Sequence, residues 1–312
     1  MISRRNIRVK VMQLLYMMEA AIEDNAIKNP VNELQKSFDK SKELLVYVIY
    51  FLTEVARYAE TDARVKANKH LPSANDLNVN TKLSGNSLLW QIIELPTFAK
   101  AVEEVNPKHL LDESVLKRIY NQLVESNTYQ AYILAQSRDK QNEKDILRFI
   151  FSDLMLPDEV FTSHVEELFN NWDDDCEMIE QLVNAFLSKP NAANFQQILS
   201  DDKWQFAKTL LVSTFNKRQH LLDIIKPKLN NWDADRIASL DMVLMQMGLC
   251  EFLYFETIPT KVTINEYIDL AKAYSTAQSG QFVNGILDNI HKELVAEDKL
   301  NKIEYKQKNN KL

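Results

Sequence analysis

Four residues near the start of the chain carry the side chains best suited to binding a nucleic acid. Arg4, Arg5 and Arg8 lie within a short basic cluster, and Tyr16 follows two helical turns later. On a helix, Arg5, Arg8 and Tyr16 fall within about 80° of each other. The guanidinium group donates paired hydrogen bonds to phosphate, and a tyrosine ring can stack on a base. This pattern indicates single-stranded RNA binding, although a solvated helix edge is an alternative interpretation.

A second candidate site lies near the C-terminus, where two of the four glycines occur. Gly280 and Gly285 bracket the start of a helix that we expect to begin near Gln281. A glycine inside a helix costs about 1 kcal/mol relative to alanine, so it usually serves close packing or ligand approach. The first turn of a helix also presents free N–H groups and a positive dipole end. We therefore expect Gly280 to let an RNA backbone approach this helix start.

The sequence does not favour catalysis. The four scattered glycines form no phosphate-binding loop, and the five histidines lie on separate segments without a zinc-binding pattern. The acidic run Asp173–Asp175 follows Trp172 and is better explained as a complement to a helix N-terminus than as a metal site. Cys176 has no basic neighbour, and Cys250 lies in an apolar run. We expect no enzymatic activity, no cofactor and no metal.

Composition predicts an all-α protein. The chain has 312 residues, of which 46% are hydrophobic and 26% charged, but only four are glycine. Sheets and hairpins need more glycine for their turns than helices do. The net charge of −7 restricts nucleic-acid binding to a local patch. The sequence shows no signal peptide or apolar run long enough to span a bilayer, and the two cysteines are far apart, so we expect a cytoplasmic protein.

Apolar spacing defines the helices that would position these candidate residues. The first helix has an apolar stripe at positions 11, 14, 15 and 18, and a second strong helix runs from Phe38 to Arg57. Residues 68–85 are polar and are typical of a loop. We expect further helices at 87–105, 112–127, 142–153, 158–172 and 174–187.

The final third has the clearest helix signals. We predict a cap at Asp233 before an apolar helix through Met247, and a capping box at Thr263–Glu266 that starts the next helix. The last helix has apolar residues at 283, 286, 287, 290 and 294. The segment 297–312 is rich in lysine and asparagine, so we expect it to be disordered.

Two blocks of this sequence resemble the NusB family of transcription antitermination factors. The first runs from Ser3 to Tyr16 and includes Gln13-Leu14-Leu15-Tyr16; the second runs from Asp202 to Leu294 and includes Phe282-Val283-Asn284-Gly285. The resemblance implies a NusB-like all-helical fold of two bundles, with a large additional helical insertion. The implied domains are 1–28 (Arg-rich helix), 29–199 (helical insertion or diverged segment), 200–296 (C-terminal bundle) and 297–312 (tail).

The resemblance also implies partners and contact residues. The expected partners are boxA RNA from ribosomal RNA leaders, the small-subunit ribosomal protein NusE and the RNA polymerase antitermination complex. The positions implied to contact RNA are Arg4, Arg5, Arg8, Gln13, Tyr16, Gln278, Ser279, Gln281 and Phe282. Those implied to contact NusE are Tyr16, Asp235 and Asp241.

Several alternatives stay open at this level. Asn6 and Ile7 interrupt the basic run, so a structural helical adaptor without RNA binding is an alternative function. Segment 29–199 can be extra scaffold, a protein-binding surface or an acidic face that mimics RNA. An rRNA methyltransferase is disfavoured, because neither a glycine-rich cofactor domain nor a Pro-Cys motif occurs.

Overall fold

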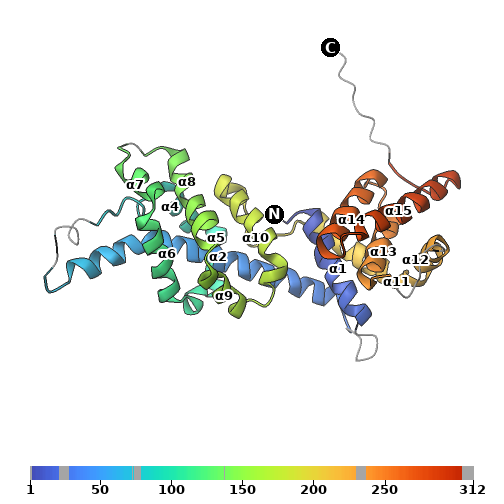
Figure 1. Cartoon of the computed structure of the whole chain (residues 1–312), viewed down its shortest axis with the longest axis horizontal. Coiled ribbons are helices and arrows are strands. Elements are labelled where there is room, and N and C mark those ends of the chain that lie inside the picture. Colours follow the sequence, from blue (N-terminus) through green and yellow to red (C-terminus); the bar gives the residue numbers. More distant parts are fainter. Residues whose placement is uncertain are drawn as a thin grey trace, which may run out of the picture. The chain divides into compact units, whose positions relative to one another are not determined.

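The computed structural model describes residues 2–20, 28–71, 73, 79–136, 138–229 and 237–303. Within these ranges the chain is helical and contains no strand, which confirms the expected all-α class (Figure 1). The chain divides into two compact units. Unit 1 comprises Met1–Ile2 and Phe38–Leu199, and unit 2 comprises Ser3–Ser37 and Ser200–Leu312.

Unit 1 is built from the long helix α2 and a series of shorter helices. Helix α2 spans Pro30–Ala67, with proline at its first position and Glu33 in its first turn, both favourable at a helix N-terminus. Its portion from Phe38 onward belongs to unit 1. The other elements are α4 (Ser87–Ile93), α5 (Pro96–Val105), η2 (Pro107–Leu110), α6 (Glu113–Glu125), α7 (Asn127–Leu134), α8 (Lys140–Phe149), η3 (Ile150–Met155), α9 (Glu159–Leu168), α10 (Trp172–Ser188) and η4 (Pro190–Ala192).

Aromatic side chains from distant parts of the sequence meet in the core of unit 1. Tyr47 and Phe51 of α2 and Phe161 of α9 are fully buried. The rings of Phe51 and Phe161 lie 4.9 Å apart in a tilted arrangement that aromatic pairs favour. Unit 1 is therefore a folded unit with its own hydrophobic core.

Unit 2 surrounds one buried helix, α13 (Ser239–Tyr254). The helices that contact α13 are α1, α11, α12, α14 and α15. A helix that is apolar on all sides belongs in an interior, and the residues from Val243 to Phe252 are buried. The bounds of the remaining elements are α1 (Arg4–Ala20), α11 (Asp201–Asn216), α12 (Arg218–Ile225), η5 (Lys226–Leu229), α14 (Thr260–Tyr274) and α15 (Ser279–Ala296).

Some predicted boundaries need correction. Helix α14 begins at Thr260 rather than at the predicted capping box, because Pro259 is the N-cap and its carbonyl accepts the first hydrogen bonds of the helix. The side chains of Thr263 and Glu266 bond to Glu251 and Arg8 instead. Helix α2 extends beyond the predicted Phe38–Arg57 at both ends. The predicted cap at Asp233 lies outside the described residues.

The start of the predicted tail is hydrogen-bonded to unit 2. The Lys302 Nζ donates hydrogen bonds of 2.8 Å to the carbonyl oxygens of both Glu251 and Phe255, at the C-terminal end of α13. The Ile303 N–H donates to the carbonyl of Glu256 at 3.0 Å. The expectation of disorder from residue 297 is therefore wrong for residues 297–303, while residues 304–312 lie outside the described part.

Candidate nucleic-acid interface

Helix α1 presents its three arginines to very different environments. Arg4 is exposed, and its guanidinium carbon lies 5.4 Å from the ring centroid of Phe206, within cation–π range. Arg5 is half-buried. Arg8 is only 3% exposed, although it lies one turn from Arg4 and Arg5. The basic cluster thus divides into two accessible arginines and one interior arginine.

Arg8 is held by two carboxylates from neighbouring helices. Its Nε and Nη2 donate to the two oxygens of Glu251 at 2.7 and 3.0 Å, and its Nη1 donates to Glu266 at 3.2 Å. Burial lowers the pKa of Arg8, but the hydrogen bonds and charge of Glu251 outweigh this effect and raise it above its ordinary value. A guanidinium buried and occupied in this way is not presented to phosphate. The structure therefore gives Arg8 a structural role and does not support direct RNA contact by its side chain.

Glu251 is the centre of this cluster and is fully buried. Besides Arg8, its carboxylate accepts hydrogen bonds from Thr263 Oγ1 at 3.1 Å and from Tyr267 Oη at 2.9 Å. Burial and the negative charge of Glu251 raise the pKa of Tyr267. The sequence motifs did not single out Glu251. The available signal was a single acid within the apolar run of α13, because a buried charge requires a partner.

The second half of α1 carries Gln13 and Tyr16. Tyr16 is 44% exposed and its neighbour Met17 is 55% exposed. Gln13 is partly buried, and its Nε2 has no hydrogen-bond partner among the described residues. Tyr16 is thus accessible for stacking, and Gln13 has a donor that is unused in this structure.

The four candidate residues at the start of α15 differ in their exposure to solvent. Gln278 and Gln281 are exposed, whereas Ser279 and Phe282 are buried. The Ser279 Oγ donates to Asp241 Oδ2 at 2.7 Å. Direct RNA contact by Ser279 or Phe282 is therefore not supported, since both side chains belong to the interior.

Asp241 does not form the surface acid that we expected for a partner. It is 5% exposed, one carboxylate oxygen accepts from Ser279, and the other has no partner among the described residues. Because this carboxylate faces α15, the structure does not support direct contact between Asp241 and NusE. Asp235 lies outside the described residues.

The two glycines of α15 have different surroundings, and those of Gly280 do not match the open ligand approach that we predicted for it. A β-carbon at Gly280 would come within 2.7 Å of the Lys272 side chain, which is flexible. A β-carbon at Gly285 would meet no atom within 4 Å. Gly280 therefore lies under a lysine of α14 rather than at an open approach for a ligand, whereas Gly285 borders open space.

The candidate residues fall at opposite ends of α13. Arg8 pairs with Glu251 near its C-terminus, and Ser279 bonds Asp241 in its first turn. The ten-residue step between these two anchor points corresponds to about 15 Å along a helix. A ligand that reaches both Arg4 and Gln278 must therefore extend along the bundle.

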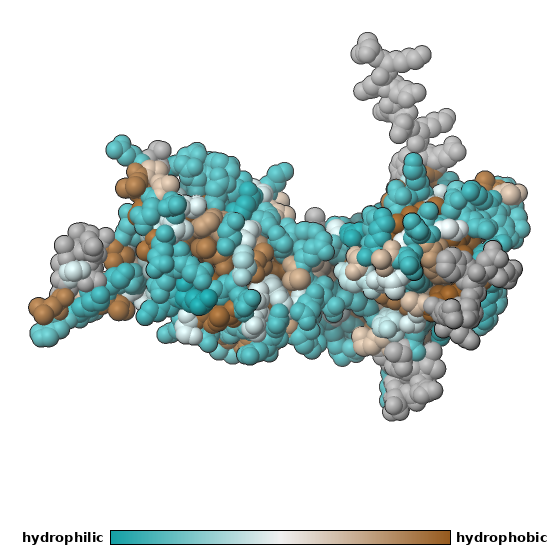
Figure 2. All heavy atoms as spheres, in the orientation of Figure 1, coloured by the Kyte–Doolittle hydropathy of each residue, from teal (hydrophilic) through white to brown (hydrophobic). Residues whose placement is uncertain are grey.

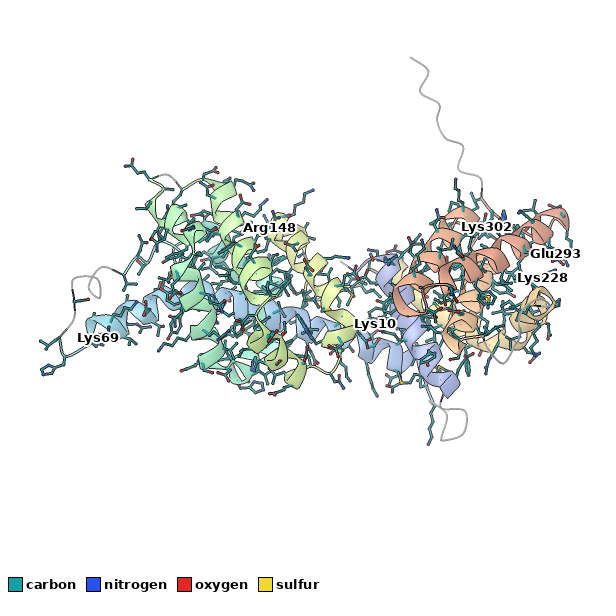
Figure 3. All side chains as sticks on the ribbon, in the orientation of Figure 1. Lys10, Lys69, Arg148, Lys228, Glu293 and Lys302 are labelled. Atoms are coloured by element: carbon teal, nitrogen blue, oxygen red, sulfur yellow. The ribbon has the colours of Figure 1, made fainter. Side chains whose placement is uncertain are left out.

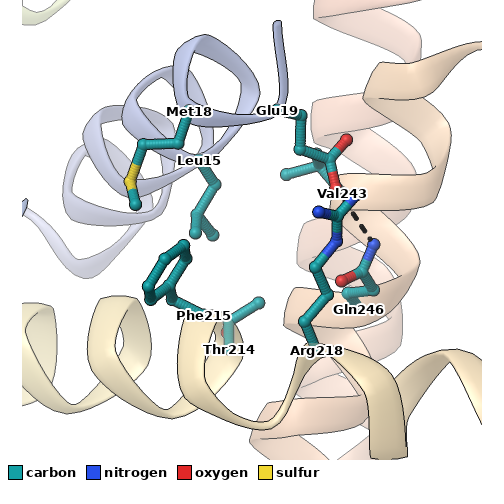
Figure 4. Close-up of a pocket in the computed structure, with 8 residues that line it drawn as sticks. All are labelled: Leu15, Met18, Glu19, Thr214, Phe215, Arg218, Val243 and Gln246. Carbon is teal, nitrogen blue, oxygen red and sulfur yellow. Dashed lines mark hydrogen bonds and ion pairs between the residues drawn. The ribbon is translucent and has the colours of Figure 1, made fainter. Parts of the chain in front are cut away.

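A pocket lies beside α1, between this helix and the helices α11, α12 and α13. Figure 4 shows Leu15 and Met18 facing Phe215 across an apolar gap, with Glu19 and Arg218 opposite. The Glu19 carboxylate lies 3.1 Å from Arg218, and partial burial raises its pKa despite this cation. Phe215 of α11 is 46% exposed, so the pocket presents apolar surface beside α1.

The family model described as "NusB family" matches residues 164–292. The match begins within α9, so it includes the end of unit 1 as well as most of unit 2. The matched region contains the central helix α13 and the start of α15, where several of the candidate residues lie.

Curated relatives give the same result. A protein of Desulfatibacillum aliphaticivorans, "Transcription antitermination protein NusB", is 40% identical over 101 residues, which are 32% of this chain and 71% of that protein. A protein of the same name in Finegoldia magna is 34% identical over 128 residues, or 41% of this chain and 85% of the relative. The one in Salinibacter ruber is 41% identical over 97 residues, or 31% and 61%. No solved structure matches significantly.

The structure also bears on membrane association. Among the helices of the described ranges, none combines the length and apolar character that crossing a membrane requires.

Proposed function

Because this chain belongs to the NusB family of transcription antitermination factors, we propose that it binds boxA-type RNA together with NusE during transcription of ribosomal RNA. The family is not catalytic, so the action is binding. Membership in this family is the observation that carries the proposal. The complex would assemble with RNA polymerase in the cytoplasm.

The accessible side chains of unit 2 support RNA binding. Arg4 and Arg5 supply charge at the beginning of α1, and Tyr16 offers an exposed ring in the second half of this helix. Gln278 and Gln281 add exposed amides at the start of α15. Phosphate contacts by arginine and base contacts by aromatic and amide groups are the usual combination for single-stranded RNA. Arg8 contributes indirectly, since it fixes α1 to α13 and α14.

The exposed apolar groups on α1 support a protein partner. Tyr16 and Met17 of α1 are both accessible. Phe215 of α11 lines a pocket with Leu15 and Met18 of α1. Aromatic and methionine side chains are enriched in protein–protein interfaces. We assign NusE to this part of unit 2, with Tyr16 shared between RNA and partner.

Titration of the double variant Arg4→Ala/Arg5→Ala with boxA RNA tests the RNA contact. For a single strand, removing one cation that neutralises a phosphate reduces the slope of log K against log salt by about 0.7. We expect weaker binding and a slope shallower by about 1.4, with and without NusE. The matched control Lys261→Ala/Lys292→Ala removes the same charge from exposed positions on α14 and α15 and should leave the slope unchanged.

The alternative of a structural adaptor predicts a different result. If wild-type protein binds NusE but does not bind boxA RNA at any salt concentration, the chain is an adaptor and the RNA assignment fails. If RNA binds but the double variant retains the wild-type slope, the arginines of α1 are not phosphate contacts.

A further inference from the structure

Unit 1 contains a basic hollow on a strongly acidic background. From Phe38 to Leu199 the sequence has 16 Lys and Arg residues against 25 Asp and Glu residues. The hollow lies between α4, the N-terminal turns of α8 and the end of α10, and no carboxylate of the described residues lines it. Its lining residues are Ser87, Leu88, Gln91, Lys140, Gln141, Lys144, Leu187, Ser188 and Pro190.

The cations around the hollow follow one face of α8. Lys140, Lys144 and Arg148 are spaced four residues apart, so they lie in a row with a rise of about 6 Å from each to the next. The Arg148 Nη2 donates to Ser188 Oγ at 3.0 Å, which places the end of this row against α10. Figure 3 labels Arg148 on this helix, and Figure 2 shows hydrophilic and hydrophobic residues side by side on the visible face of unit 1.

The two lysines are not neutralised by neighbouring acids. Within the described residues, no carboxylate lies within ion-pair distance of Lys140 or Lys144. The acids of α8 and its cap are otherwise engaged: Asp139 caps the helix through Asn142, and Glu143 is buried against Ser87. Asp145 accepts from Gln141 and pairs with Arg148 at 4.0 Å, so Arg148 is partly neutralised while the two lysines are not. The free N–H groups of the first turn of α8 add further positive potential beside Lys140.

We propose that this hollow binds the phosphate backbone of single-stranded RNA, as a second contact separate from α1 and α15. Two lysines one helical turn apart, without an ion-pair partner among the described residues, suit successive phosphates of a polyanion. Beside the lysines, Gln91 Nε2 donates to Asn191 Oδ1 at 2.9 Å and Ser188 Oγ donates to the Asn184 carbonyl at 2.8 Å, so the proposal depends on the charge of Lys140 and Lys144. This inference rests on the proposed function in one respect: the chain must bind RNA during transcription.

A salt titration of RNA binding tests this site in the full-length protein. The variant Lys140→Glu/Lys144→Glu is titrated with single-stranded RNA that carries boxA and flanking nucleotides, and with the boxA element alone. We expect the longer RNA to bind about tenfold more weakly, with a salt slope shallower by about 1.4, and the short RNA to bind as it does to wild type. The variant Lys140→Gln/Lys144→Gln should show a smaller loss of affinity for the longer RNA. It replaces the glutamate variant in the titration if charge reversal disturbs folding.

The control variant Lys108→Glu/Lys117→Glu makes the same charge change at exposed lysines of η2 and α6. If this control weakens binding of the longer RNA as much as the α8 variant does, the effect is one of net charge and the site is wrong. An unchanged slope in the α8 variant also overturns it. Polyglutamate is also added as a competitor for the bound RNA. If it displaces the RNA as effectively as unlabelled RNA of the same charge concentration, the ligand of the hollow is an acidic protein and the RNA site is wrong.

The outcome is distinguishable from failure of the proposed function. If the Arg4→Ala/Arg5→Ala variant binds RNA normally while the α8 variant does not, the hollow is an RNA site and the arginines of α1 are not RNA contacts. If only the Arg4→Ala/Arg5→Ala variant is impaired, the α1 contact stands and the hollow is not an RNA site.

Discussion

Burial decides what each individual arginine of α1 does. Arg4 and Arg8 are one helical turn apart, yet Arg4 is exposed while Arg8 is 3% exposed and occupied by Glu251 and Glu266. A bidentate guanidinium–carboxylate pair is geometrically specific and cannot be reproduced by lysine. Arg8 therefore defines how α1 packs on α13 and α14.

Removing the Arg8 side chain should destabilise unit 2. Arg8→Ala leaves the Glu251 carboxylate buried without its counter-charge, so we expect a loss of about 3–5 kcal/mol in the free energy of unfolding. Chemical denaturation followed by circular dichroism measures this loss. The control Arg5→Ala, on the same helix but partly exposed, should change stability by about 0.5 kcal/mol or less.

A double variant separates the loss of the pair from the cost of the orphaned charge. Arg8→Met/Glu251→Gln removes both charges and should recover a large part of the stability that Arg8→Ala loses. Equal destabilisation in the single and double variants would show that packing of the arginine side chain, rather than charge pairing, holds α1 in place.

Among the helices, α13 depends on close approach by its neighbours. A β-carbon at Gly248 would lie 2.9 Å from Leu287 of α15 and 3.3 Å from Tyr267 of α14. Glycine at this position lets the two helices pack closely against α13. Gly285 of α15 is also helical but faces open space, so it has no such packing role.

These two glycines form a matched pair of substitution sites. Gly248→Ala should destabilise unit 2 by about 1–3 kcal/mol through overpacking. Gly285→Ala should stabilise it by about 0.5–1 kcal/mol, because alanine is the better helix former. Denaturation midpoints measure both effects. Loss of stability in Gly285→Ala would contradict the open space beside that position, and loss of RNA affinity alone would place a ligand there.

The molecule as a whole contains two units with separate cores. Phe161 lies in the core of unit 1, whereas Arg8 and Gly248 belong to unit 2. The family-model match begins at residue 164, so residues 38–163 of unit 1 lie outside it. Multi-domain proteins frequently depart from two-state unfolding.

We therefore expect two components in the calorimetric unfolding of the full chain. Phe161→Ala empties a fully buried position, costs about 3–5 kcal/mol, and should lower the midpoint of one component. Arg8→Ala should lower the midpoint of the other. If either variant shifts both components equally, the two units unfold as one cooperative structure.

Much of the architecture follows from the sequence. The scarcity of glycine and the apolar spacing indicated an all-helical chain, and helices occur at α1, α2 and α15 close to where the spacing placed them. Boundaries were less accurate where capping residues had other partners. Thr263 and Glu266 have the types and spacing of a capping box, but they bond to Glu251 and Arg8 instead.

Composition and periodicity predicted the helical class, and short motifs indicated the family and a list of candidate binding residues. Which of those residues reach solvent depends instead on contacts between distant segments. Arg8 meets Glu251 across 243 positions of the chain, and Asp241 meets Ser279 across 38. Local spacing can place a charge on a helix face, but it cannot say what covers that face, because the covering side chains come from elsewhere in the fold.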